Sequence, residues 1–139
     1  MIVVLDTNVF ISSFFGGNPR LIIDHWKTGR FKIGLSPAII EEYIEVLGRL
    51  GLADEPELKE ILDLLARGAG ILFTVDPPEL RVVKDDPDDD KFIACAAALK
   101  AEFVITGDKA LHAVKSFGGI RILTPAEFLA RADYLLPHD

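Results

Sequence analysis

The sequence has few of the features that mark secreted, disulfide-bonded or membrane proteins. Cys95 is the single cysteine of 139 residues, which excludes an intramolecular disulfide and a cysteine-based zinc site. The longest apolar run, Phe92 to Leu99, is far shorter than the roughly 20 residues of a membrane span. No basic segment precedes the early charge of Asp6, so we expect no signal peptide. These absences favour a protein of the reducing cytoplasm with no membrane partner.

Several common catalytic signatures are also missing. The sequence contains no Walker motif, no G-x-G-x-x-G, no G-x-S-x-G and no C-x-x-C. We expect Cys95 to be a buried small hydrophobe. We expect the three scattered histidines to be surface or partly packed residues: His25, His112 and His138. Three aromatic residues are expected to be core or dimer contacts: Phe14, Phe15 and Trp26.

Basic residues are in the minority. The chain has 22 Asp plus Glu against 15 Lys plus Arg, and its formal net charge is −7. That balance argues against unspecific electrostatic binding to nucleic acid or to anionic membranes. Half of the residues are hydrophobic and the mean hydropathy is +0.29, which excludes a disordered chain. The length predicts one domain over residues 1–139.

Short apolar runs alternate with segments of helical periodicity. Alternation of this kind predicts an α/β fold with a parallel sheet and helices on both faces. Helices are expected to begin at four pairs of a capping residue and proline: Asn18-Pro19, Ser36-Pro37, Glu55-Pro56 and Thr124-Pro125. Two further helices are expected at about 89–99 and at 109–115. The expected strands are 2–5, 31–35, 71–75, 103–106 and 120–123.

Two of these strands are followed by aspartates. Asp6 comes directly after the first strand, and Asp108 follows the strand that ends at Thr106. Ligand sites in parallel sheets lie at the carboxyl ends of strands, so we expect both carboxylates at one edge. The alternative is local: Asp6, with Thr7 and Asn8, and Asp108 can each cap the helix that follows.

Other acids are harder to assign from spacing. The run Asp85 to Asp90, broken by Pro87, resembles a solvated helix start. Asp89 and Asp90 each have apolar residues at the helical offsets, so periodicity does not choose between them. Glu41 and Glu42 lie in the first turns of a helix, where exposed glutamates are common.

Converging carboxylates without histidine or cysteine form an all-oxygen site, which suits Mg²⁺ or Mn²⁺. Such sites commonly serve phosphoryl chemistry. Two alternatives are an aspartyl phosphatase of the HAD type with Asp6 as nucleophile, and a non-enzymatic phospho-Asp signalling or binding module. The first usually has a second aspartate where this chain has Asn8. The second has an acidic pair near the first strand, and none precedes Asp6, although Lys109 lies where its lysine is expected.

Four separated segments together resemble the PIN domain family, in its branch of VapC-like toxin components. They are Val4-Leu5-Asp6-Thr7-Asn8-Val9, Glu42-Tyr43-Ile44-Glu45-Val46-Leu47, Asp88-Asp89-Asp90-Lys91-Phe92-Ile93-Ala94 and Val104-Ile105-Thr106-Gly107-Asp108-Lys109. Their order and spacing agree with the family over essentially the whole chain. The resemblance implies a three-layer fold with a twisted parallel sheet of four or five strands.

The resemblance also implies a function and a set of site residues. Members are Mg²⁺- or Mn²⁺-dependent ribonucleases, commonly homodimers, and the toxins are silenced by a cognate antitoxin. The acids that match the family pattern are Asp6, Glu42, Asp90 and Asp108, with Asn8 and Thr106 as polar neighbours. Lys91 and Lys109 are candidate phosphate contacts. Gly107 replaces the Arg or Asn of many toxins, which removes one RNA contact. An acidic cleft is further expected to attract a basic segment of an antitoxin.

Overall fold

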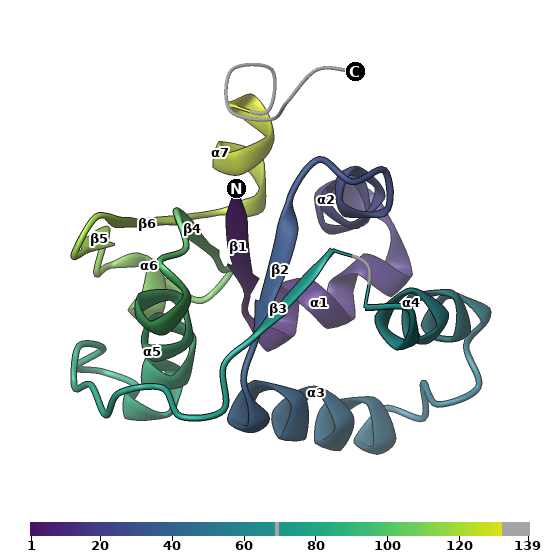
Figure 1. Ribbon diagram of the computed structural model, residues 1–139, viewed down its shortest axis with the longest axis horizontal. Helices are drawn as coiled ribbons and strands as arrows, with labels where there is room; N and C mark the ends of the chain where they lie inside the picture. Colours follow the sequence, from purple (N-terminus) through teal and green to yellow (C-terminus); the bar gives the residue numbers. More distant parts are fainter. Residues whose placement is uncertain (69, 132–139) are drawn as a thin grey trace.

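A mostly parallel sheet forms the centre of the protein (Figure 1). The computed structural model describes residues 1–68 and 70–131. Its strands are β1 (Ile2–Leu5), β2 (Lys32–Leu35), β3 (Ile71–Phe73), β4 (Phe103–Ile105), β5 (Ser116–Phe117) and β6 (Ile120–Leu123). They lie in the order β3-β2-β1-β4-β6-β5. Every neighbouring pair is parallel apart from β5 and β6, which are antiparallel.

The helices follow the strands along the chain. They are α1 (Thr7–Ser12), α2 (Gly17–Lys27), α3 (Pro37–Arg49), α4 (Pro56–Ala66), α5 (Asp90–Leu99), α6 (Lys109–His112) and α7 (Pro125–Ala130), with 3₁₀ turns at Ser13–Phe15 and Pro87–Asp89. Ser36 caps α3 by accepting the Ile39 N–H, and Thr124 forms a capping box with Glu127 at α7. These side chains satisfy amides that the first helical turn leaves unpaired.

The expected α/β class is confirmed, and several details differ. The sheet has six strands rather than four or five, because the two-residue β5 adds an antiparallel edge. Helix α1 was not expected, and α2 begins at Gly17, before the Asn18-Pro19 pair. Helix α6 ends at His112 rather than 115. His138 lies outside the described residues.

The sheet changes its winding direction between β1 and β4. From β1 the chain proceeds outward to β2 and β3, and it then returns to place β4 on the other side of β1. The register pairs Leu5 with Ile105, and the Asp6 N–H donates to the Ile105 carbonyl oxygen at 3.0 Å. The residues after these two central strands, Asp6 and Thr106, therefore lie side by side at the position where open α/β sheets form their sites.

Helices cover both faces of the sheet (Figure 1). Helix α5 packs on one face, against β1, β2, β4 and β6. Its approach to β2 is close at Gly34, where an added Cβ would lie 2.8 Å from Leu99 Cδ1 and 3.2 Å from Val4 Cγ2. On the other face, the Trp26 indole of α2 is buried and donates to the Gly70 carbonyl oxygen at 2.9 Å. The expectation that Trp26 belongs to the core is confirmed.

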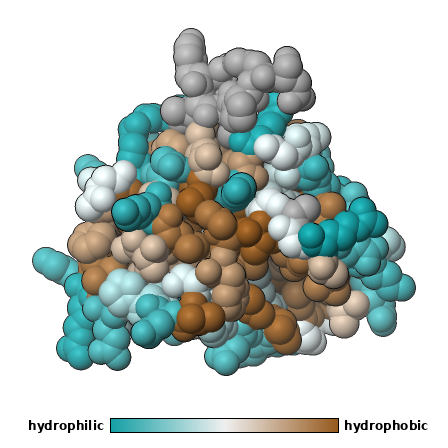
Figure 2. Space-filling model, in the orientation of Figure 1, coloured by the Kyte–Doolittle hydropathy of each residue, from teal (hydrophilic) through white to brown (hydrophobic). Residues whose placement is uncertain are grey.

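Part of the surface is apolar. Figure 2 shows hydrophobic side chains gathered over β3 and α3 in the view of Figure 1. The exposed large hydrophobic residues there include Ile44 of α3 and Phe73 of β3, and Leu62 of α4 is also exposed. Within residues 1–68 and 70–131, no helix combines the length and the apolar character needed to cross a membrane.

Candidate functional site

Asp6 is a buried carboxylate at the carboxyl end of β1. Its side chain is held from two directions: Oδ1 accepts the Val9 N–H at 2.8 Å, and Oδ2 accepts the Thr106 hydroxyl. The residue is only 3% exposed. Burial raises its pKa, although the hydrogen bonds from Thr106, Val9 and Gly107 oppose this effect. Asp6 therefore does cap α1, and it also faces the acids described next.

Thr106 connects Asp6 to Asp108 at the end of β4. Its buried hydroxyl donates to Asp6 and accepts the Asp108 N–H at 2.9 Å. Asp108 in turn caps α6, since its Oδ1 accepts the Ala110 N–H at 3.3 Å. Each aspartate therefore caps the helix that follows its strand, and Thr106 joins the two.

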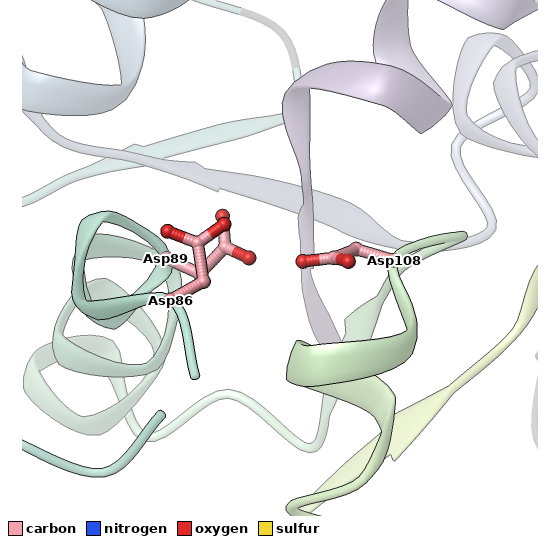
Figure 3. Close-up of side chains that lie close together, drawn as sticks. All are labelled: Asp86, Asp89 and Asp108. Atoms are coloured by element: carbon pink, nitrogen blue, oxygen red, sulfur yellow. The ribbon is translucent and has the colours of Figure 1, made fainter. Parts of the chain in front are cut away.

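Asp89 completes a group of three carboxylates with Asp86 and Asp108. Figure 3 shows Asp108 pointing across a gap toward Asp86 and Asp89, which come from the segment before α5. One carboxylate oxygen from each lies within 4.8 Å of those of the others. Burial, the hydrogen bond with Asp108 and the charges of Asp86, Asp108 and Asp6 raise the pKa of Asp89 to about 8. The hydrogen bond with Asp89 lowers the pKa of Asp108.

Asp90, one of the four acids expected at the site, lies outside this group. Its Oδ1 accepts the N–H groups of Val82 and Val83, at 2.9 and 2.8 Å, and its side chain lines a different depression formed with residues 77–84. Successive helical residues point about 100° apart, so only one of two adjacent acids can face the β1–β4 edge. The structure turns Asp89 toward that edge and uses Asp90 to hold the incoming loop.

Glu42 of α3 lies beside Thr7, the residue that follows Asp6. Its Oε2 accepts the Thr7 hydroxyl, and its Oε1 forms an ion pair with Lys91 Nζ at 2.8 Å. Glu41 is exposed and takes no part. Lys91 also pairs with Asp88 at 3.3 Å. Burial disfavours the charged form of Lys91 and so lowers its pKa. The hydrogen bonds and charges of Glu42 and Asp88 have the larger combined effect, and the net pKa of Lys91 is raised.

These side chains line one cleft of about 430 Å³. Its walls include Asp6, Thr7, Asn8, Glu42, Asp86, Asp88, Asp89 and Asp108, with Glu45, Val46 and Arg49 of α3 at one end. Of the two candidate phosphate contacts, Lys91 is engaged by carboxylates, whereas Lys109 is exposed beside Asp108. Sequence reasoning left Asp86 among the solvated acids and considered Thr7 only as a possible helix cap.

The cysteine and several of the histidine and aromatic residues were expected to have no catalytic role. Cys95 is fully buried, and burial raises the pKa of its thiol to about 12, so it is no nucleophile. His112 pairs with Glu127 at 2.7 Å on the surface. Phe14 is buried in the core, whereas Phe15 is exposed.

The donor set fits a hard divalent cation. All of the converging donors are oxygens. Asp89 Oδ2 is buried and, among the described residues, has no hydrogen-bond partner. An unpartnered buried carboxylate oxygen is costly unless a cation or proton satisfies it. Asp86, Asp89 and Asp108 therefore form a group that could hold a metal ion, with Asp6 nearby.

Comparison with known proteins agrees with this geometry. The sequence model of the PIN domain matches residues 2–110. The chain is also 31% identical to an uncharacterized protein of Methanocaldococcus jannaschii, over 91% of this chain and 88% of that protein. The match includes the strands and loops that carry all of the acids of the cleft. The chain belongs to the PIN domain family.

Proposed function

We propose that this protein is a metal-dependent endoribonuclease that hydrolyses phosphodiester bonds of single-stranded RNA. PIN domains are generally metal-dependent nucleases. The observation that carries the proposal is the group of Asp86, Asp89 and Asp108, with one oxygen from each within 4.8 Å of the others, in which the buried Asp89 Oδ2 has no hydrogen-bond partner among the described residues. A bound Mg²⁺ or Mn²⁺ supplies a polarised water and stabilises charge on the phosphorus under attack.

The residues of the cleft would have different roles in metal binding and substrate binding. Asp86, Asp89 and Asp108 would hold the ion, and Asp6 would add a carboxylate whose orientation is fixed by Val9 and Thr106. This set replaces Asp90 of the expected acids with Asp89. Glu42 and Asn8 line the cleft where the substrate enters. Lys109 is exposed next to Asp108, where it can contact an RNA phosphate.

The wider biological role is also part of the proposal. We infer a toxin of the VapC-like type, located in the cytoplasm, formed by one domain over residues 1–139 and acting as a homodimer. The exposed Ile44 and Leu62, which border an apolar groove between α3 and α4, support self-association. The acidic cleft supports binding of a basic antitoxin segment. Sedimentation velocity of the purified chain tests the dimer.

The decisive assay is cleavage of structured and unstructured RNA with Mn²⁺, with Mg²⁺ and with EDTA. We expect cleavage that depends on the metal and that Asp6→Asn removes. Asp63→Asn, which makes the same change on an exposed residue of α4, is the matched control and is expected to cleave normally. Undiminished cleavage by Asp6→Asn would refute the proposal. Phosphate release from a small phosphoester in place of RNA cleavage would favour an aspartyl phosphatase.

A further inference from the structure

Lys91 lines the depression next to the cleft, beside Asp90, and it reaches two of the acids that line the cleft, Glu42 and Asp88. It is the second residue of α5, directly after Asp90, and its side chain is only 19% exposed. Nζ lies 2.8 Å from Glu42 Oε1 and 3.3 Å from Asp88 Oδ1. Glu42 is likewise 20% exposed, so this contact is partly shielded from water, whereas Asp88 is largely exposed.

The ion pair divides the acids of the cleft into two groups. On one side, both oxygens of Glu42 already have donors, Thr7 and Lys91. On the other side, oxygens of Asp86, Asp89 and Asp108 lie within 4.8 Å of one another, and Asp89 Oδ2 has no partner among the described residues. One group is therefore neutralised by the chain itself, and the other still requires a cation.

Phosphoryl-transfer sites built from many carboxylates often hold two divalent ions about 3.5–4 Å apart. A second ion on the Glu42 side would have to displace the Lys91 ammonium, because both would use the same carboxylate oxygens. The ammonium is tethered to α5 and therefore has no entropy of association to overcome, unlike a free ion. Occupancy of the Glu42 side by Lys91 is thus favoured over a second metal.

We propose that the Lys91 ammonium takes the place of a second divalent ion, so that the cleft binds one metal ion, on the side of Asp86, Asp89 and Asp108. This inference rests on the proposed metal-dependent function. Lys91 is then a positioning residue: it holds the Glu42 carboxylate at the cleft wall and keeps it from coordinating the metal. It also makes Lys91 unavailable as a phosphate contact.

The test counts bound Mn²⁺ by isothermal titration calorimetry and by electron paramagnetic resonance of the free ion, using the full chain. We expect one ion in the wild type and one in Lys91→Arg, which retains the charge. Lys91→Met releases Glu42 and removes the positive charge that neutralises it. It is expected to bind a second ion, or to bind the first about tenfold more tightly.

The double variant Lys91→Met, Glu42→Gln is expected to lose that gain, because Glu42 supplies it. Circular dichroism checks that each variant folds. If Lys91→Met does not fold, Glu42→Gln alone serves as the test: it should still bind one ion, with affinity weakened by less than about tenfold.

The outcomes separate the two levels of the proposal. Two ions in the wild type, an unchanged count and affinity in Lys91→Met, or loss of the ion in Glu42→Gln overturns the role of Lys91 alone. A wild type that binds no Mn²⁺ overturns the metal-dependent function itself.

Discussion

Replacing Asp89 by asparagine should make the metal-free protein more stable while removing its response to metal. The carboxylate is partly buried beside Asp86, Asp108 and Asp6, and these neighbours with burial raise its pKa from 3.8 to about 8. The folded state therefore binds a proton that the unfolded state has released between about pH 4 and 8. Stability of the wild type consequently falls as pH rises through that range. An asparagine side chain at this position carries no charge and avoids this loss.

The size of the effect follows from the same shift. Without solvent screening, a pKa of about 8 against 3.8 corresponds to about 4 kcal/mol at pH 7. Asp89 is partly exposed, and the lowered pKa of Asp108 offsets a share of the cost. We therefore expect Asp89→Asn to gain about 1–2 kcal/mol in EDTA at pH 8, or about 3–8 °C in Tm. The gain should disappear near pH 4.

Adding Mn²⁺ should reverse the order of the two proteins. An ion at one hundred times its Kd stabilises the folded wild type by about 2.7 kcal/mol, and Asp89→Asn should lose most of this. Asp90→Asn is the matched control, one residue along. Its Oδ1 accepts the Val82 and Val83 N–H groups, and the uncharged amide oxygen of asparagine is a weaker acceptor, so the change should cost about 1 kcal/mol with or without metal.

Thermal and urea unfolding with and without Mn²⁺ measure these differences. If Asp89→Asn were less stable than the wild type in EDTA at pH 8, or were stabilised by Mn²⁺ as strongly, the electrostatic account of the cleft would be refuted.

The remaining predictions concern protons and packing. Mn²⁺ affinity should rise between pH 6 and 8, because Asp89 must lose its proton to coordinate the ion. Calorimetry in buffers of different ionisation enthalpy should detect the released proton, and binding that does not change with pH would contradict this prediction. Gly34→Ala should lose about 1–3 kcal/mol in urea unfolding, since its Cβ would lie 2.8 Å from Leu99 Cδ1. Gly48→Ala in α3, where the Cβ meets open space, should instead gain about 1 kcal/mol.

The placement of Asp6 and Asp108 together could be predicted from the sequence, because it depends on two regular features. The apolar runs that precede them indicate buried strands, and parallel strands end at a common edge. The Ser36-Pro37 and Thr124-Pro125 pairs predicted two helix starts for a similarly local reason, which is the need to satisfy the first amides.

The choice between Asp89 and Asp90 could not be predicted from helical spacing. It depends on a 3₁₀ turn over Pro87–Asp89 and on the backbone amides of Val82 and Val83. These two amides lie outside the helix of Asp90, and they donate hydrogen bonds to its carboxylate. The short α1 and β5 were not predicted from the sequence, for a related reason. Their six and two residues carry too little periodicity to be detected, and they are stabilised by contacts made elsewhere in the fold.

The pairing of β1 with β4 has a consequence for the newly synthesised chain. Asp6 leaves the ribosome about a hundred residues before the segment that completes its surroundings, which carries Thr106 and Asp108. Contacts this distant in sequence form late, because a long loop must close first. A nascent chain that ends before β4 therefore holds an isolated aspartate rather than an acidic cleft. Under the proposed function, the protein acquires the capacity to cleave RNA only after β4 and the loop that carries Asp108 have been synthesised.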